Sequence, residues 1–236
     1  MKKLGIILLC LTIVTGCKHN ESETKEPMVV VKEHPKVVFG CYPYHKKDLY
    51  KQLDMAFFTD IAYYSYDINP NDGTSLSIHD WESTALIDTL KAKGIRSFLA
   101  VTNIGVANNK KLLGNSNAIE TLTNHIIRLI KMRDADGVCI NFEEVSKLNK
   151  NNYSKFITLL SRKLKQNNNE YLLYITVPYI DKNKSLDFSA LNQVVDHFVI
   201  FELETELKET SNYKGSIEYY LSNKIPSTKL SVANAL

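Results

Sequence analysis

Residues 134–144 read DADGVCINFEE, and the middle of this segment has the length and continuous apolar character of a buried β-strand. Because side chains alternate between the two faces of a strand, Cys139, Asn141 and Glu143 share one face. The opposite face is apolar and would meet covering helices; it carries Val138, Ile140 and Phe142. Burying an unpaired polar group costs roughly 2–7 kcal/mol. An amide and a carboxylate on one face therefore indicate a functional strand end, where barrel enzymes keep catalytic groups.

Apolar runs of strand length recur on both sides of this segment. They cover residues 37–42, 61–66, 95–101, 171–177, 198–201 and 230–235, with helical patterns between them at about 48–57, 86–90, 119–130, 153–164, 188–194 and 217–221. A strand followed by a helix, repeated along the chain, predicts right-handed βαβ units and a parallel sheet. The chain has no Gly-x-Gly-x-x-Gly fingerprint, which favours an α/β barrel of the TIM (β/α)8 type over a doubly wound sheet.

The number of strands falls short of a complete barrel of this type. A closed TIM barrel has eight strands and about 250 residues, whereas the pattern from residue 36 to residue 236 supplies seven strands. We therefore expect residues 36–236 to form a barrel that is incomplete at its C-terminus, as in a fragment of a longer protein. The alternative is an open barrel, whose exposed strand edges would promote aggregation.

The N-terminus has the anatomy of a bacterial export signal. Lys2 and Lys3 precede an apolar run, residues 4–14, that is shorter than the roughly 20 residues needed to span a bilayer. The run ends in Val-Thr-Gly before Cys17, which resembles a lipobox. We expect residues 1–16 to be a lipoprotein signal peptide and Cys17 to carry acyl chains, each CH₂ contributing roughly 0.8 kcal/mol to membrane binding. The alternative is a plain secretory signal with a chance cysteine.

Behind this signal, residues 18–27 are polar and charged and lack apolar periodicity, and we expect residues 17–35 to form a flexible tether. The expected location is the bacterial cell envelope, with the protein lipid-anchored and periplasmic or surface-facing. With 44% hydrophobic and 23% charged residues the chain has a globular composition. Its net charge of only +3 gives no reason to expect a nucleic-acid partner. Neither a P-loop nor paired Cys/His spacing is present, so we expect no cofactor and no metal.

The segment 136–143 resembles the fourth-strand signature of glycoside hydrolase family 18, Asp-Gly-x-Asp-x-Asp-x-Glu. Asp136, Gly137 and Glu143 match it, while Cys139 and Asn141 stand in place of its second and third aspartates. Strand ends elsewhere are also similar to the family: Tyr-Pro-Tyr at 42–44, Tyr-Ser-Tyr at 64–66 and Thr-Val-Pro at 176–178. The segment 101–105, Val-Thr-Asn-Ile-Gly, resembles the subgroup that contains spore-cortex lytic enzymes.

This resemblance implies a retaining mechanism in which the substrate's own 2-acetamido oxygen attacks the anomeric carbon. Glu143 would be the general acid and then the base, and Asn141 would orient the acetamido group. The partner would be a glycan with β-linked N-acetylglucosamine, such as a chitin-like oligosaccharide, peptidoglycan or an N-glycan core. The residues that the resemblance implies for glycan binding are Tyr44, Tyr66, Asn103 and Glu204.

Two readings of the site remain open from the sequence. An amide at position 141 can accept a hydrogen bond from the acetamido N–H but cannot supply a negative charge. Glycoside hydrolase family 85 uses an Asn-x-Glu pair, which Asn141 and Glu143 resemble. On the sixth strand, Leu203 occupies the position of a family tyrosine that holds the acetamido carbonyl, unless Tyr213 replaces it. The sequence therefore predicts either an active glycosidase or a catalytically silent, lectin-like relative.

Overall fold

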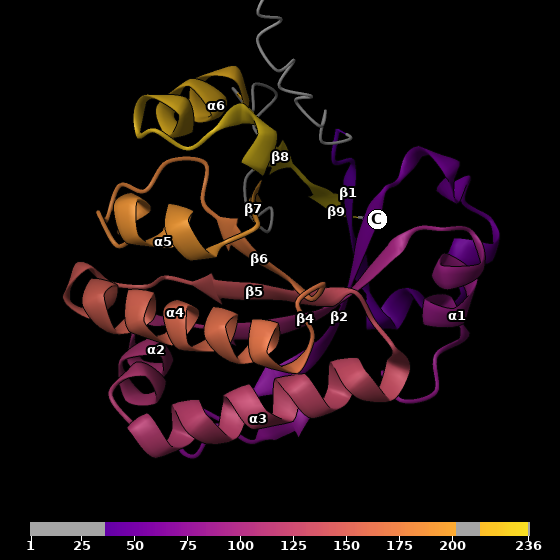
Figure 1. Cartoon of the computed structure of the whole chain (residues 1–236), viewed down its shortest axis with the longest axis horizontal. Coiled ribbons are helices and arrows are strands. Elements are labelled where there is room, and N and C mark those ends of the chain that lie inside the picture. Colours follow the sequence, from indigo (N-terminus) through magenta and orange to yellow (C-terminus); the bar gives the residue numbers. More distant parts are fainter. Residues whose placement is uncertain (1–35, 202–212, 236) are drawn as a thin grey trace, which may run out of the picture. The chain divides into compact units, whose positions relative to one another are not determined.

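The computed structural model describes residues 36–201 and 213–235. Cys17, Glu204 and the segments expected to be the signal peptide and the tether lie outside the described residues. Figure 1 shows parallel strands with helices packed along them.

The main strands follow the predicted apolar runs. They are β1 (Phe39–Pro43), β2 (Asp60–Ile68), β4 (Arg96–Ile104), β5 (Gly137–Glu143), β6 (Leu172–Val177), β7 (His197–Ile200), β8 (Leu230–Val232) and β9 (Asn234–Ala235). A short β3 (Ser75–Ser77) pairs antiparallel with the end of β2. The helices are α1 (Ala85–Ala92), α2 (Val106–Leu113), α3 (Ser116–Arg133), α4 (Lys150–Asn167), α5 (Phe188–Val194) and α6 (Tyr213–Ser222). The predicted α/β architecture with about seven barrel strands is confirmed.

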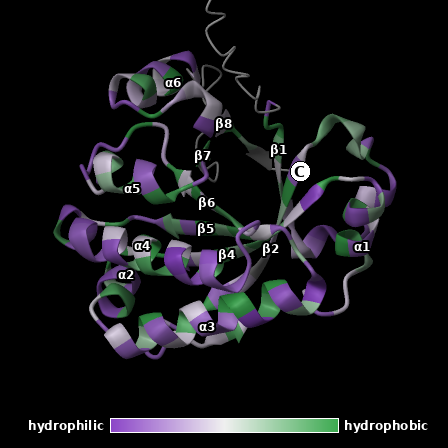
Figure 2. Cartoon of the chain, viewed as in Figure 1, coloured by the Kyte–Doolittle hydropathy of each residue, from purple (hydrophilic) through white to green (hydrophobic). Residues whose placement is uncertain are grey.

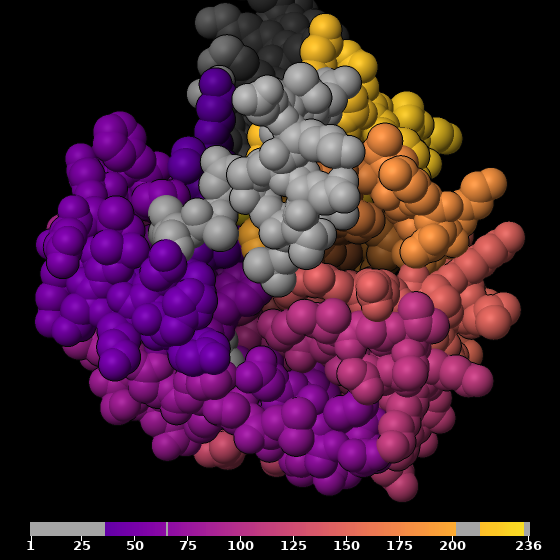
Figure 3. Space-filling view, turned by 180° about the vertical axis from the view of Figure 1, so that it is seen from behind, coloured from indigo at the N-terminus to yellow at the C-terminus, as the bar shows by residue number. Residues whose placement is uncertain are grey.

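The parallel strands are paired in the order β8-β7-β6-β5-β4-β2-β1-β9. β8 and β9 are consecutive in the chain, so the stretch 230–235 pairs with β7 through its first half and with β1 through its second. Between them, the Ala233 N–H donates to the Ile200 carbonyl at 3.0 Å. Within the described residues both edges of the sheet are thus bridged, in contrast to the exposed edges of an open barrel. Figure 3 shows the early segments in indigo lying against the middle segments in magenta, as this strand order requires.

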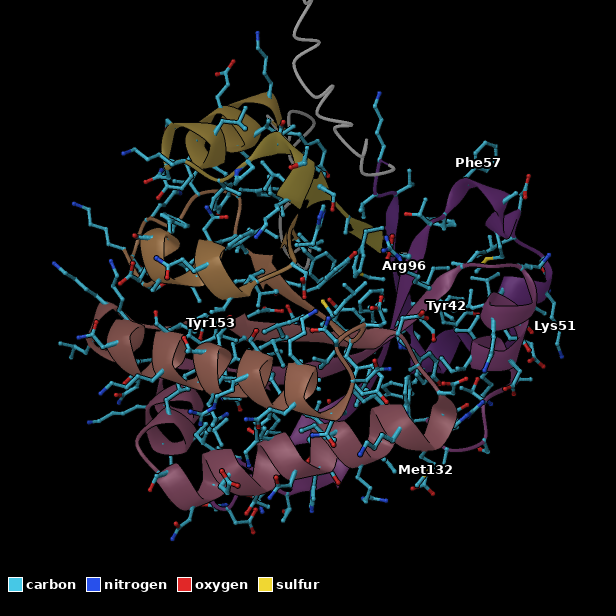
Figure 4. The ribbon with its side chains drawn as sticks, viewed as in Figure 1. Tyr42, Lys51, Phe57, Arg96, Met132 and Tyr153 are labelled. Carbon is cyan, nitrogen blue, oxygen red and sulfur yellow. The ribbon has the colours of Figure 1, made fainter. Side chains whose placement is uncertain are left out.

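Each strand separates an inner core from an outer core. The inner core is made of buried residues from the strands and from positions directly after them: Phe39, Cys41, Ala62, Phe98, Ala100, Cys139, Tyr174, Val199, Phe201 and Ala233. The outer core lies between the strands and the helices; Phe142 packs there against Tyr153 and Phe156 of α4, at ring distances of 5.8 and 5.4 Å. Figure 2 shows the strands mostly in the green of hydrophobic residues and the helices in alternating green and purple. Figure 4 places Tyr153 between α4 and the sheet, whereas Met132 projects outward.

The start of β5 explains the Asp-Gly pair of the motif. The Asp136 carboxylate accepts the N–H of Ser97 at 2.7 Å, which fixes the start of β5 beside β4. A Cβ on Gly137 would lie 2.1 Å from the carbonyl oxygen of Leu172, so only glycine lets β5 and β6 approach this closely. Asp136 and Gly137 therefore hold β5 against β4 and β6, and they lie at the end of β5 opposite to Glu143.

The helix predicted over residues 48–57 is wrong. Two 3₁₀ helices, Tyr44–Lys51 and Met55–Phe57, occupy this region, and Lys47 interrupts the first with a φ of 44°. The reason is the buried Tyr42, whose hydroxyl accepts the N–H of Tyr50 at 2.8 Å and donates to the Lys47 carbonyl at 2.9 Å. These backbone groups are then no longer available for the regular bonds of an α-helix.

Candidate active site

Asn141 and Glu143 lie side by side at the carboxyl end of β5, as the strand period predicts. Asn141 is 1% exposed, and Glu143 at the strand end is partly exposed. The Asn141 Nδ2 donates to Glu143 Oε1 at 3.1 Å. An N–H donor facing a carboxylate oxygen stabilises its ionised form.

The other end of the Asn141 amide is held by the neighbouring strand. Thr176 of β6 points into the barrel, and its hydroxyl donates to Asn141 Oδ1 at 2.6 Å. A row of three polar side chains thus runs from β6 to the end of β5. Thr176 begins the Thr-Val-Pro strand end that resembles the family, but the sequence assigned it no role, because a contact between two strands depends on their register.

The main chain of Glu143 is fixed from outside the barrel. Asn109, buried in α2, donates through Nδ2 to the Glu143 carbonyl at 2.5 Å. Asn103 in turn donates to Asn109 Oδ1 at 2.9 Å. Asn103, expected to bind substrate, is 4% exposed and supports Glu143 through Asn109.

A cavity of about 460 Å³ opens at the carboxyl ends of β5 and β6. Its lining includes Glu143, Glu144, Thr176, Asp181, Lys182 and Phe201. The Asp181 carboxylate is used within its own loop, since it accepts the Ser185 N–H, the Ser185 hydroxyl and the Leu186 N–H, each at 2.9 Å. A second cavity of about 620 Å³ lies at the opposite end of the barrel beside Arg96. Because none of the predicted site residues lines that cavity, we assign the site to the first.

The structure separates the predicted tyrosines. Tyr66 is buried in the outer core, where its hydroxyl donates to the Gly73 carbonyl at 3.3 Å and lies 3.4 Å from His125 Nδ1. Tyr66 therefore does not line the cavity beside Glu143, and its expected role in glycan binding stays a prediction. The cause is a bulge in β2: Tyr64 pairs with Ala100 and Tyr66 with the next residue, Val101, so the two tyrosines face opposite ways.

Tyr64 is the tyrosine that faces the barrel interior. Its ring lies 5.8 Å from that of Phe201, and the Cys41 thiol is 3.5 Å from its hydroxyl. Burial raises the pKa of Tyr64 well above its usual value, and the nearby cysteines and Glu143 raise it further, so the phenol stays protonated. The resemblance implied Tyr66 rather than Tyr64 for glycan binding, and the bulge in β2 decides that Tyr64 is the one facing the interior.

Tyr44 follows β1 at the same end of the barrel as Glu143. Its side chain is 40% exposed and stacks on the His79 ring with an interplanar angle of 10°. It does not line the cavity beside Glu143. Tyr213 lies 3.4 Å from Tyr179, hydroxyl to hydroxyl.

Cys41 and Cys139 are both free and buried in the inner core. Burial raises the pKa of Cys41 to about 12 and that of Cys139 well above its usual value. The two thiols therefore stay protonated and act as apolar filling below Asn141.

No group of His, Cys, Asp or Glu side chains in residues 36–201 and 213–235 is arranged to hold a metal ion. Over the same residues, no helix combines the length and apolarity that crossing a membrane requires.

Comparison with known proteins agrees with the predicted family. The family model described as Glycosyl hydrolases family 18 matches residues 38–235. One curated relative is YdhD from Bacillus subtilis, which carries the provisional name of a sporulation-specific glycosylase. The two sequences are 26% identical over 172 residues, and the alignment covers 67% of this chain and 40% of YdhD. This chain thus spans less than half of that relative's length.

Solved structures share the fold at low sequence identity. The spore cortex-lytic enzyme SleL of Bacillus megaterium superposes with a TM-score of 0.71 at 14% identity, covering 84% of this chain and 50% of SleL. A class V chitinase from Nicotiana tobaccum, in complex with NAG4, superposes with a TM-score of 0.69 at 14% identity, covering 84% of this chain and 66% of the chitinase. With the family model matching most of its length, this chain belongs to glycosyl hydrolases family 18.

Proposed function

We propose that this protein hydrolyses glycans containing β-linked N-acetylglucosamine, by a retaining mechanism assisted by the substrate's acetamido group. One observation carries the proposal: the Glu143 carboxyl group lines a cavity of about 460 Å³ at the carboxyl end of the barrel, where barrel enzymes keep their catalytic groups. Membership of family 18 supports it, as do the similar chitinase structures in complex with NAG4 and (GlcNAc)3.

In the proposed reaction Glu143 transfers its proton to the glycosidic oxygen as the bond to the anomeric carbon breaks. The acetamido oxygen of the same sugar attacks that carbon and forms a cyclic oxazolinium intermediate. Glu143, now ionised, accepts a proton from the water that opens this ring. Two inversions at one carbon give net retention of configuration.

Asn141 would orient the acetamido group without adding charge. Its amide oxygen has a second lone pair beyond the one that Thr176 uses at 2.6 Å. That lone pair can accept the acetamido N–H. A neutral amide does not stabilise the positive intermediate as a carboxylate would, so the expected rate is lower than with aspartate at this position.

The hydrogen bonds of Asn141 and Asp181 favour a second candidate, a glycan-binding protein that does not hydrolyse. Both ends of the Asn141 amide are bonded within the protein, and the loop uses the carboxylate of Asp181. Such a cleft would still bind the glycan through Glu143 and the surrounding polar groups. Only a rate measurement separates the two candidates.

The test is hydrolysis of a chromogenic di-N-acetylchitobioside by the wild-type protein and by Glu143→Gln. Removing the proton donor should lower the rate about 10²–10⁴-fold, while binding of chitotetraose by calorimetry should persist. Glu218→Gln, an exposed change on α6, serves as the control. Full activity in Glu143→Gln would assign the acid to another residue. Absence of hydrolysis in the wild type, with equal binding by both forms, would support the glycan-binding candidate.

We also propose that acyl chains on Cys17 anchor the protein in the bacterial cell envelope. The support is the apolar run 4–14 followed by Val-Thr-Gly-Cys at 14–17. Cys17→Ala should move the full-length protein from membrane to soluble fractions. Cys10→Ala, within the same signal, should leave it with the membrane. Membrane association of the Cys17 variant equal to that of wild type would contradict the anchor.

A further inference from the structure

Thr176 is a buried threonine in the Thr-Val-Pro end of β6, where the sequence assigned it no role, and its hydroxyl has two carbonyl oxygens within reach. The Asn141 Oδ1 lies at 2.6 Å and the main-chain oxygen of Ile140 at 3.4 Å. Thr176 is 6% exposed and Asn141 is 1% exposed, so water does not compete freely for these bonds. The short bond to Asn141 is therefore the main one that this hydroxyl donates.

This bond decides which way the Asn141 amide faces. A primary amide accepts hydrogen bonds only at its oxygen and donates only at its nitrogen. With Oδ1 held by Thr176, Nδ2 must point the other way, and it reaches Glu143 Oε1 at 3.1 Å. An amide turned by 180° would present its oxygen to Glu143 and would favour a protonated carboxyl group.

We propose that Thr176 is a positioning residue that fixes the donor end of the Asn141 amide toward Glu143. The inference rests on the proposed function, because the charge state of Glu143 matters for catalysis only if Glu143 is the acid and base. Through this contact Thr176 favours the ionised form of Glu143, the form that acts as the base in the second step.

Other titratable groups among the described residues lie near Glu143, and none of those named here forms a hydrogen bond with Thr176. Glu144, Asp181 and Lys182 line the same cavity. From inside the barrel, Tyr64 and Cys139 stay neutral because burial raises the pKa of each. Removal of the Thr176 hydroxyl leaves all of these groups in place. A change in the titration of Glu143 would then come from the Asn141 amide.

The experiment is an NMR titration of the full chain carrying ¹³C at the glutamate side-chain carboxyl carbons. The signal that disappears in Glu143→Gln identifies Glu143. In Thr176→Val, which keeps the side-chain shape, the midpoint of Glu143 should rise by about 0.5–1 pH unit as the amide becomes free to turn. Thr176→Ser restores a hydroxyl and should bring the midpoint back.

Thr123→Val is the matched control, because Thr123 in α3 is fully buried and donates to the Ile119 carbonyl at 2.7 Å. This control should leave the Glu143 midpoint unchanged. An unchanged midpoint in Thr176→Val would overturn the inference, as would a failure of Thr176→Ser to restore it. If circular dichroism shows that the valine variant does not fold, Thr176→Ala replaces it under the same criteria.

The titration needs no turnover, so it separates this inference from the proposed function. A moved midpoint in a protein without hydrolysis would reject the proposed function and keep the positioning role of Thr176. Hydrolysis by the wild type together with an unmoved Glu143 midpoint in Thr176→Val would keep the proposed function and reject the positioning role of Thr176. In an active protein, the alkaline limb of the pH–rate profile should move upward in Thr176→Val and return in Thr176→Ser.

Discussion

Each end of the barrel interior holds one carboxylate, Asp60 at the amino end and Glu143 at the carboxyl end, and the neighbours of the two carboxylates differ. At the amino end Asp60 is fully buried, and Arg96 binds both of its oxygens at 2.7 and 2.8 Å. The Tyr174 hydroxyl donates to the same carboxylate at 3.2 Å. At the carboxyl end Glu143 is partly exposed, takes a neutral N–H from Asn141 and borders a cavity.

This difference separates a structural carboxylate from one suited to chemistry. A fully buried carboxylate whose two oxygens are bound by a guanidinium is held in place by that pair and is closed to substrate. A carboxyl group beside a neutral amide and an open cavity can reach substrate and change its charge. Figure 4 shows Arg96 among the strands and Phe57 at the surface.

The largest expected effect on stability comes from breaking the pair at the amino end. Arg96→Met leaves Asp60 buried without a cation and should lower the free energy of unfolding by about 3 kcal/mol. This is the low end of the usual range, because the Arg96 side chain is 34% exposed. Urea denaturation measures the change.

Arg128→Met is the matched control for this prediction. Arg128 and Glu82 form an exposed pair at 4.0 Å, whose loss should cost less than about 1 kcal/mol. Equal effects of the two substitutions would show that Asp60 does not depend on Arg96, and the contrast between the two ends would fail.

A pH-dependent effect of intermediate size is expected from His197, also at the amino end. Burial, with Arg96 and Lys229 nearby, lowers the pKa of His197 from its usual 6.5 to about 4. Its Nε2 is buried without a hydrogen-bond partner among the described residues. Between pH 4 and 6.5 the unfolded chain therefore binds more protons, so stability falls as the pH is lowered through this window.

The contribution of His197 to this loss should be about 2–3 kcal/mol. It is measured as the difference between wild type and His197→Gln in the free energy of unfolding at pH 7 and at pH 4. The wild type should lose more stability on acidification than the variant. Parallel pH curves for the two proteins would mean that His197 is not held neutral in the folded state.

The smallest effect is expected at the carboxyl end and has the opposite sign. Glu144 follows Glu143 with a φ of 59°, a conformation that costs a non-glycine residue about 1–2 kcal/mol. Glu144→Gly should raise the free energy of unfolding by about 0.5–1 kcal/mol, because the flexibility of glycine in the unfolded chain offsets part of the relief. Thermal denaturation measures it.

Lys224→Gly, at a φ of 65° after α6, should stabilise by a similar amount and serves as the control. A gain at Lys224 but a loss at Glu144 would indicate that the Glu144 side chain stabilises the fold in its own right. The positive φ of Glu144 would then not be a source of net backbone strain beside Glu143.

The sequence by itself predicted the parts of this protein that depend on local periodicity. The period of two along residues 138–143 places Asn141 next to Glu143, and the observed distance of 3.1 Å agrees with it. The apolar runs gave the strands and their order because strands buried on both faces are continuously apolar. Helices α3 and α4 were equally clear, since each repeats an apolar stripe over 18 residues.

Contacts between elements decided the rest. The bulge in β2 depends on how it pairs with β4, and it turned Tyr66 outward and left Tyr64 inside. Asn103, which precedes the end of β4, faces α2 and acts through Asn109. The contact of Thr176 with Asn141 arises only when β6 lies beside β5. Strand register is set by many distant residues at once, so a local pattern identifies a face but not the partner across it.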